Sequence, residues 1–485
     1  MMRNTVVSTS PDVDAVVVGA GPNGLLAAIT LAQAGMKVVV FEAGSRAGGG
    51  MRSEELTNPG VIHDVCSAVH PLALASPAMR ALPLADHGVT WLQPRVAVAH
   101  PLDDGRAALI AKSIEQTTAS LGSDAATYRR RFSPFVKAGS ALVDASLGGL
   151  NIPISALRHS PAAMVRYGLT APRSAEHIAN WFSTPEARAA MAGMAAHSIL
   201  PLDEPITGAM AVFFTTLAHH VGWPVVKGGS QQLADALVSI LKSHGGDVFC
   251  GRRIRDLGDL PSARAVVLDL TPRQVLAVAD EVLPGGYVRK LRRFRYGPGV
   301  FKLDLVLDGP IPWTNPAVAE AGTVHVGGTF EEVAAAEKAV SAGDHPERPF
   351  VLLSQPSIVD GTRAPAGQHV VWAYCHVPHA SRYDMTEAIE SQIERFAPGF
   401  RDRIIARHTM DSAALENHNA NEIGGDINGG MSDWRQLFFR PSRAARPWAT
   451  PVEGLYLCSS STPPGGGVHG MGGLHAANEV LCRVK

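Results

Sequence analysis

The sequence predicts an α/β protein: a three-layer, Rossmann-like domain joined to a second domain with a mixed sheet and a helical cap. Two observations predict the first domain. A strand, glycine turn, helix and strand open the chain, and a second strand, glycine turn and helix lie at 454–485. Helical segments dominate 111–222 and strand-like runs recur from 299 to 377, which predicts the second domain between these patterns.

The first pattern is a dinucleotide-binding βαβ unit. The apolar run at 13–18 suits a strand buried on both faces, and it leads into a turn with the sequence GAGPNG at 19–24. The first glycine permits the tight turn, the second lets a pyrophosphate approach the backbone, and the third allows helix and strand to pack closely. The acidic residue that ends the next strand is placed to accept hydrogen bonds from ribose hydroxyls. The predicted contacts are Gly19, Gly21, Pro22, Asn23, Gly24, Glu42 and Ala43.

A second glycine-rich loop favours FAD over NAD as the cofactor. Three consecutive glycines are flanked by two arginines, which can neutralise a pyrophosphate. A simple NAD dehydrogenase has no need of this loop. The predicted contacts are Arg46, Gly48, Gly49, Gly50 and Arg52.

The segment 454–485 provides another anion-facing turn. A buried strand at 455–458 is followed by a polar, glycine-rich stretch and then by a helix from about Gly472. We expect the backbone and hydroxyl groups of this turn to face the cofactor. The predicted contacts are Ser461, Gly467, Val468 and His469.

These motifs resemble those of a known family. The array E-x3-R-x-G-G-G-x-R resembles glutathione-reductase-type flavoproteins, in the branch that holds amine oxidases and phytoene desaturases. Phrases such as P-I-P-W-T-N-P and R-F-A-P-G-F-R-D-R-I resemble the phytoene-dehydrogenase-like family, and within it the subgroup named after pyridine nucleotide-disulphide oxidoreductase domain-containing protein 2. The resemblance covers nearly the whole chain and implies non-covalently bound FAD. It also implies that the strand before Ile254 lies beside the adenine and that the closing segment passes the flavin ring.

The expected domains interrupt each other along the chain. We expect the FAD-binding domain at 12–80, 223–290 and 441–485. The substrate domain is expected at 81–222, with the helical cap, and at 291–440. Within it, charged residues including Lys302 and Asp304 alternate with apolar ones, which predicts a half-exposed strand.

Two histidines are candidates for proton transfer. His469 lies in the closing glycine segment expected at the flavin ring, and His70 follows the Arg52 loop. For each, the competing interpretation is a histidine that only packs or orders a loop. Neither a zinc-protease motif nor a paired Cys-x-x-Cys occurs, so no metal is predicted.

The composition of the chain limits the kinds of partner and the cellular compartment that we expect for the protein. A net charge of −1 argues against a nucleic-acid surface, and five scattered cysteines favour a reducing, cytoplasmic compartment. No apolar run is long enough to span a membrane. The apolar segment 141–171 is read as part of the buried cap, with peripheral membrane contact as the alternative.

Together these features predict an FAD-dependent oxidoreductase that dehydrogenates a mainly apolar, polyene-like or isoprenoid-like small molecule. Hydride would pass from a C–H bond to flavin N5. With a single GxGxxG unit in the sequence, we expect dioxygen or a quinone as the electron acceptor. Three alternatives remain open: amine oxidation, double-bond isomerisation, and an FAD-binding interaction protein with little turnover. The oligomeric state is not predicted.

Overall fold

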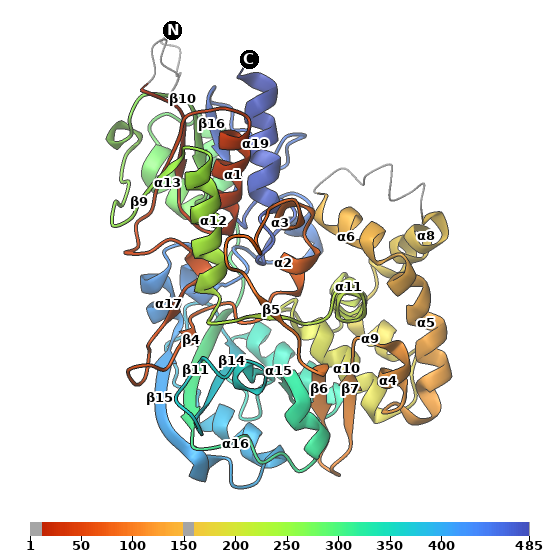
Figure 1. The fold of residues 1–485 in the computed structure, drawn as a ribbon. Coiled ribbons are helices and arrows are strands. Elements are labelled where there is room, and N and C mark those ends of the chain that lie inside the picture. Colours follow the sequence, from red (N-terminus) through yellow and green to blue (C-terminus); the bar gives the residue numbers. More distant parts are fainter. Residues whose placement is uncertain (1–11, 149–159, 485) are drawn as a thin grey trace.

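Two sheets organise the fold, and they lie one above the other in Figure 1. The computed structural model describes residues 12–148 and 160–484. The upper sheet has five strands in the order β16-β10-β1-β2-β9, and every neighbouring pair is parallel. Its strands are β1 (Val13–Val18), β2 (Val38–Phe41), β9 (Asp247–Phe249), β10 (Ala263–Leu268) and β16 (Leu455–Leu457).

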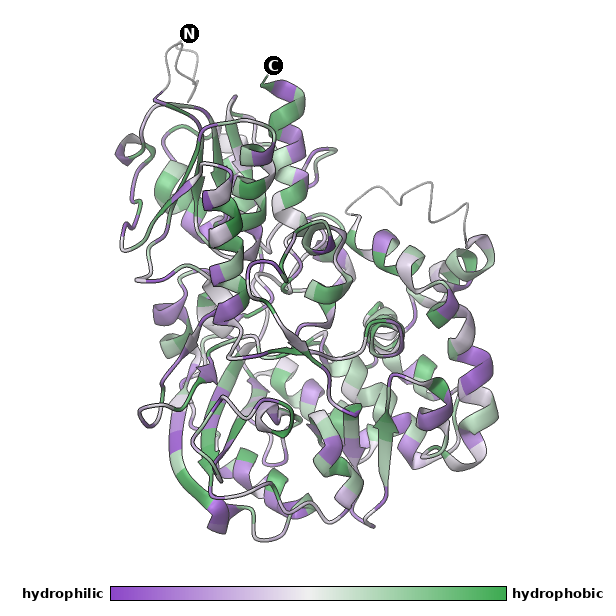
Figure 2. Ribbon diagram, viewed as in Figure 1, coloured by the Kyte–Doolittle hydropathy of each residue, from purple (hydrophilic) through white to green (hydrophobic). Residues whose placement is uncertain are grey.

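Helices cover both faces of this sheet. On one face, α1 packs against two helices from distant parts of the chain, and this layer shares a core with Ala15 and Val17 of β1. On the other face, two helices share a core with Val16 and Val18. The predicted three-layer Rossmann-like domain is therefore confirmed, and α1 is apolar along much of its length (Figure 2). The first layer comprises α1 (Pro22–Gln33), α12 (Gln231–Ser243) and α19 (Met471–Arg483), and the second α13 (Pro272–Ala279) and α14 (Gly285–Arg292).

The lower sheet is mixed, as predicted. It has seven strands in the order β15-β11-β14-β13-β12-β6-β7, in which only β12 and β6 pair in parallel. Helix α16 (Thr386–Phe396) packs on one face, and α15 (Phe330–Ala342) lies against β14 on the other. The strands are β6 (Val96–Pro101), β7 (Ala107–Ile110), β11 (Gly299–Leu307), β12 (Ala321–Val326), β13 (Val351–Ser354), β14 (His369–Val377) and β15 (Ile404–Met410).

The prediction that β11 is half-exposed was wrong. Every residue of the strand is buried, including Lys302 and Asp304, which form a buried ion pair. Nδ1 of His63 lies 3.6 Å from the carboxylate of Asp304, and that of His408 lies 3.7 Å away. A polar cluster thus covers the face that simple alternation assigns to solvent.

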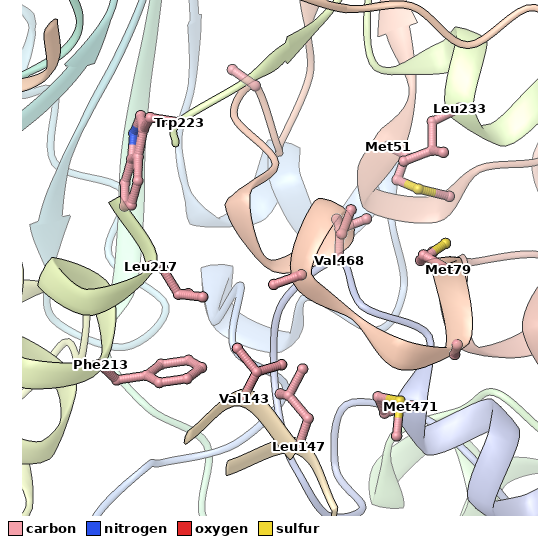
Figure 3. Close-up of a cluster of buried hydrophobic side chains, with 14 of the residues drawn as sticks. Met51, Met79, Val143, Leu147, Phe213, Leu217, Trp223, Leu233, Val468 and Met471 are labelled. Carbon is pink, nitrogen blue, oxygen red and sulfur yellow. The ribbon is translucent and has the colours of Figure 1, made fainter. Parts of the chain in front are cut away.

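A helical cap flanks both regions and reaches the closing cofactor segment. It comprises α4 (Ile114–Thr118), α5 (Ala125–Lys137), α6 (Gly139–Leu147), α8 (Pro161–Thr170), α9 (Ala175–Ala179), α10 (Pro185–Ala196) and α11 (Thr207–His220). Val143 and Leu147 of α6 share a core with Trp223 and Val468 (Figure 3). The expectation of a buried cap at 141–171 is met by α6, whereas α8 is helical but exposed along much of its length, including Val165 and Leu169. The middle of the segment, 149–159, lies outside the described residues.

Shorter elements complete the chain. They are α2 (Pro71–Ala75), α3 (Pro77–Arg80), α17 (Ser412–His418), α18 (Trp434–Leu437), β3 (Ser53–Glu54), β4 (His63–Asp64), β5 (Trp91–Leu92) and β8 (Val225–Val226). The 3₁₀ turns are η1 (Gly49–Met51), η2 (Gly122–Asp124), η3 (Leu257–Asp259), η4 (Pro316–Glu320), η5 (Pro356–Ile358), η6 (Arg401–Arg403) and η7 (Ile423–Gly425). Over 12–148 and 160–484, none of the helices combines the length and the apolarity needed to cross a bilayer.

Candidate active site

A cavity of about 390 Å³ is lined by residues of both sheets and of the cap. One end is formed where β1, β2 and β10 finish, at the carboxyl edge of the upper sheet. The other end reaches the lower sheet at β13 and β14. Ligands of open parallel sheets bind at this carboxyl edge, so the cavity lies where a dinucleotide is expected.

The GAGPNG turn forms one wall of the cavity. Gly19, Gly21, Pro22 and Asn23 line it, and helix α1 begins at Pro22 without a side-chain cap. Apart from Gly24 N, which donates to the Asp269 carboxylate at 2.9 Å, this helix N-terminus presents its N–H groups to an anion. Gly24 lies outside the lining, where a Cβ would come within 2.0 Å of the Gly19 carbonyl oxygen. The close contact of helix and strand predicted for Gly24 is therefore present.

Glu42 joins the two glycine loops. One carboxylate oxygen accepts a hydrogen bond from Ala20 N at 2.8 Å, and the other accepts one from Gly44 N at 2.7 Å. Glu42, the predicted ribose contact, and Ala43, a predicted cofactor contact, both line the cavity. Each oxygen keeps a second lone pair for a ligand hydroxyl.

The second loop matches the expectation only in part. Gly49, Gly50 and Arg52 line the cavity. The guanidinium of Arg52 is held by Gly49 O at 3.1 Å and by Nδ1 of His418 at 3.0 Å. Gly48 lies behind the lining and ties the two loops together, since its N–H donates to Ala20 O at 2.8 Å.

Arg46 does not face the cavity. Its guanidinium pairs with Asp235 of α12 at 3.3 Å and is about half exposed. The prediction that it neutralises a pyrophosphate therefore lacks support from this geometry. Arg252 and Arg253 line the cavity beside Ile254, the residue expected at the adenine. Sequence reasoning missed both arginines because they lie outside any glycine motif.

The closing segment forms part of the cavity wall. Gly467 and Val468 line the cavity as predicted, and Ser459 and Ser460 do so as well. Ser461 instead lies outside the cavity lining, and its hydroxyl donates a hydrogen bond to Gly429 O at 2.6 Å.

The two candidate histidines are buried behind the lining. Nδ1 of His469 accepts a hydrogen bond from Met471 N at 3.0 Å, at the start of α19. The ring of His70 contacts the Ser230 hydroxyl at 2.8 Å. Burial lowers the pKa of each imidazole to about 4, so both are neutral at neutral pH. This geometry favours the loop-ordering interpretation, and the predicted catalytic roles receive no support from it.

A polar segment that the sequence did not identify forms much of the remaining wall. Asn417–Glu422 and Asp426–Gly429 line the cavity. Asn421 bonds this segment to the upper domain, donating to Asp269 O at 2.8 Å and accepting from Thr271 N at 2.9 Å. The available signal was the dense run of Asn and His at 417–421, which lacks apolar periodicity.

Asp269 is a second acid that the sequence did not reveal. It follows β10, lines the cavity, and its carboxylate accepts a hydrogen bond from Gly24 N at 2.9 Å. Burial, reinforced by the charge of Glu42, raises the pKa of Asp269 to about 7. A carboxyl that is about half protonated at neutral pH repels a nearby phosphate less than a fully ionised one does.

The opposite end of the cavity is aromatic. Trp372 and Tyr374 lie two residues apart on β14, so both side chains project from the same face of the strand. Their rings meet edge to face, with centroids 5.1 Å apart. Trp223, Leu352 and His197 complete this wall. Burial lowers the pKa of His197 to about 3, which keeps this ring uncharged. We call these five residues the aromatic wall.

Neither cysteine nor histidine chemistry suggests a metal here. Within 12–148 and 160–484, no group of three or more His, Cys, Asp or Glu side chains is arranged to hold a metal ion.

Comparisons with known proteins agree with this geometry. Residues 17–82 match the family model of the NAD(P)-binding Rossmann-like domain. The chain is 27% identical to rat pyridine nucleotide-disulfide oxidoreductase domain-containing protein 2, across 98% of this chain and 94% of the rat protein. A phytoene desaturase (neurosporene-forming) of Rhodobacter capsulatus is 23% identical over 53% of each chain.

Solved structures share the fold. Wild-type putrescine oxidase bound to putrescine superposes with a TM-score of 0.61 at 18% identity, covering 97% of this chain and 99% of that structure. The predicted resemblance and fold class are confirmed. The chain is an oxidoreductase of this fold, and FAD is the cofactor that the matches and the site support.

Proposed function

We propose that the protein is an FAD-dependent oxidoreductase that dehydrogenates a mainly apolar small molecule, polyene-like or isoprenoid-like in character. One observation carries the proposal: a single cavity joins a backbone anion cradle at Gly21 and Glu42 to the aromatic wall. FAD, when bound, supplies the acceptor for the hydride. The protein supplies the cradle, a water-poor reaction space and the orientation of the substrate.

The residues around the cradle fit FAD. The α1 N-terminus and the Gly49–Gly50 backbone would hold the pyrophosphate, with Arg52 as its counter-charge. Glu42 would hold the ribose, and Ile254 would lie beside the adenine. The closing residues Gly467 and Val468 would border the flavin.

The chemistry of the aromatic wall supports an apolar substrate. Its lining side chains are two indoles, a phenol, a leucine and a neutral imidazole, and none carries a formal charge at neutral pH. Burying an alkene or isoprenoid chain here costs no desolvation of fixed charge. The weak similarity to a phytoene desaturase points to the same substrate class.

Amine oxidation is the second candidate, and the perpendicular Trp372–Tyr374 pair favours it. Aromatic faces stabilise cationic or amine groups, and putrescine oxidase shares the fold. The same cavity also admits double-bond isomerisation, and an FAD-binding protein with little turnover is the alternative outside catalysis.

A substrate screen on purified holoprotein tests these proposals. Denaturation should release FAD, and recovery of FMN alone would contradict the proposed cofactor. Linear polyenes, cyclic terpenes and primary amines are then mixed anaerobically with the protein while flavin absorbance is followed. We expect an apolar alkene to bleach the flavin. Bleaching by amines alone would favour amine oxidation. A flavin that no compound bleaches would favour an FAD-binding protein with little turnover. Recovery of colour with air or with a soluble quinone identifies the acceptor, whereas rapid bleaching by NADH or NADPH would reveal a nicotinamide site.

Peripheral membrane contact and a cytoplasmic location remain part of the proposal. Val165 and Leu169 on α8 are 62% and 70% exposed, which provides an apolar contact for a bilayer surface. Co-sedimentation with phosphatidylcholine vesicles, compared between the wild type and Leu169→Ser, measures this contact.

A further inference from the structure

One acidic side chain in the cavity has an oxygen without a hydrogen-bond partner. Glu422 precedes η7 and is 5% exposed. Its Oε1 accepts a hydrogen bond from Asn419 Nδ2 at 3.0 Å, whereas Oε2 is buried with no partner in the described chain. An unpaired oxygen on a buried carboxylate is unfavourable, so a proton, a water molecule or a ligand is needed to satisfy it.

The surroundings of Glu422 link it to both ends of the cavity. The Cys66 thiol hydrogen-bonds to its carboxylate. A Cβ built on Gly50 of the cofactor loop would lie 3.6 Å from Cys66 Sγ and 3.9 Å from Glu422 Oε1. The thiol also acts electrostatically on the hydroxyl of Tyr374 in the aromatic wall. Glu422 and Cys66 therefore lie beside Gly50 of the cofactor loop, and both line the cavity that also reaches the aromatic wall.

From this juxtaposition we propose that Glu422 is the catalytic base of the reaction, the group that accepts the substrate proton when hydride leaves. The inference rests on the proposed function. In a dehydrogenation, one C–H bond breaks with both electrons moving to oxidised FAD, and the neighbouring C–H bond breaks with its electrons forming the C=C bond. The proton released in the second step passes to the Glu422 carboxylate and from there to solvent. The substrate loses two electrons, and FAD gains them.

The electrostatics suit this role near neutral pH. Burial raises the pKa of Glu422 to about 7, against the opposing effects of Asn419 and Cys66 as hydrogen-bond donors. A base works best when its pKa lies near the working pH. Burial raises the pKa of Cys66 well above its ordinary value, so the thiol stays protonated and acts as a donor.

Other cavity groups are less suited to this role. His197 is neutral and holds its proton only in strong acid. The carboxylate of Asp269 is directed to Gly24 N in the dinucleotide cradle, away from the aromatic wall. The previously predicted histidines, His70 and His469, lie behind the lining.

The test replaces the carboxylic acid by its amide. Glu422→Gln keeps the shape and the acceptor for Asn419 but cannot take a proton. We expect normal FAD occupancy and a fall of about 10²–10⁴-fold in the rate of anaerobic bleaching by the best compound of the screen. In the wild type that rate should rise with pH through about 7, because the base must be ionised, and this limb should be absent in the variant.

A substrate-free readout accompanies the rate. Infrared difference spectra of the FAD-loaded protein between pH 5 and pH 9 should show carboxylic C=O bands that disappear near pH 7, one from Glu422 and one from Asp269, whose pKa is also about 7. Glu422→Gln should remove the Glu422 component and leave that of Asp269. Glu390→Gln should keep both, and it is a matched control because Glu390 is buried but pairs with Arg407 outside the cavity. A Glu422→Gln protein whose band keeps its full wild-type intensity, or that bleaches at the wild-type rate with the wild-type pH profile, would overturn the inference.

A second variant keeps the test decisive if Glu422→Gln does not fold. Asn419→Ala removes the donor to Oε1, and loss of that donor should raise the pKa of Glu422 and move the limb to higher pH. A limb that does not move contradicts the assignment. A wild-type protein that binds no FAD, or that no compound bleaches, disproves the proposed function instead, so the two failures are distinct.

Discussion

The two ends of the cavity are built in different ways. The dinucleotide end is mainly backbone: short glycine-rich stretches, each contiguous in sequence, turn their N–H groups toward an anion. The aromatic end is made of side chains from the residue after α10, the short loop before β8, and two strands of the lower sheet. A site made of backbone is encoded locally, whereas a site made of side chains depends on how distant segments meet.

The largest effect is expected for Gly21→Val, a substitution that disrupts only the dinucleotide end of the cavity. Gly21→Val should abolish FAD binding, because even a Cβ at this position would lie 2.9 Å from the Asp269 carboxylate and a longer side chain would occupy the pyrophosphate approach. Bound FAD is measured by absorbance after gel filtration. Gly168→Ala on α8 is the control, since nothing lies within 4 Å of its added Cβ. A fully yellow Gly21→Val protein would refute the cradle.

A smaller loss at the same end is expected for Glu42→Ala. The variant loses the ribose acceptor and the bridge between Ala20 N and Gly44 N, so FAD affinity should fall by about 1–3 kcal/mol. Titration of the apoprotein with FAD, followed by flavin fluorescence, gives the dissociation constant. An unchanged constant would mean that the carboxylate has only a local structural role.

Low pH should lower the folding stability of the protein through the buried histidines next to the aromatic end. Burial lowers the pKa of His100 to about 4 and that of His325 well below its ordinary value, and Nε2 of His325 lies 3.1 Å from Nε2 of the cavity residue His197. Between about pH 6.5 and pH 4 the unfolded chain binds protons that the folded protein excludes, so stability falls as pH decreases. For a histidine such as His100 the loss at pH 5 is about 2 kcal/mol.

Thermal unfolding at pH 8 and pH 5 measures this loss. His100→Gln should reduce the difference between the two melting temperatures, and His244→Gln, at an exposed position, should not. Equal melting temperatures at both pH values in the wild type would contradict the prediction.

Next in size is a change confined to the aromatic wall. Trp372→Leu removes one ring of the perpendicular pair but keeps an apolar side chain, so KM for an apolar substrate should rise about 10-fold with FAD occupancy unchanged. For an amine substrate the rise should be larger, because the cation–π contact is lost as well. Steady-state kinetics on both substrate classes separate the two candidates, and an unaltered KM for both would show that the substrate binds elsewhere.

The smallest chemical effect is expected for His469→Ala. Its imidazole accepts from Met471 N behind the cavity lining, so bleaching in the FAD-loaded fraction should stay within about 3-fold of the wild type, whereas stability and FAD affinity should fall together. Single-turnover reduction and occupancy are measured on one preparation. A 100-fold slower reduction at full occupancy would restore His469 as the acid or base.

The sequence therefore predicts the two ends unequally well. Positions such as Gly21, Glu42 and Gly467 follow from local turn chemistry and lie where they were expected. Arg46 was misjudged because the presence of a charge near a loop does not say which way the side chain turns, and Asp235 captures it. Glu422 was invisible because no motif surrounds it, and its significance comes from Cys66, which is far away in sequence.

The buried strand β11 makes the same point for the fold. An alternating pattern assigns its charged residues to solvent unless something covers them, and no rule of periodicity reveals that His63 and His408 pack there. The strand-like runs of the sequence predicted the mixed sheet, but they carried no information about which face of each strand is open.

The position of β16 in the upper sheet has a consequence for biosynthesis. This strand pairs with β10, and Gly467 and Val468, which border the cavity, follow it in the chain. A ribosome therefore finishes β1, β2, β9 and β10 long before it makes the strand that completes their sheet. FAD capture should therefore await residues 455–483, because the cavity lacks part of its wall until this segment has been synthesised.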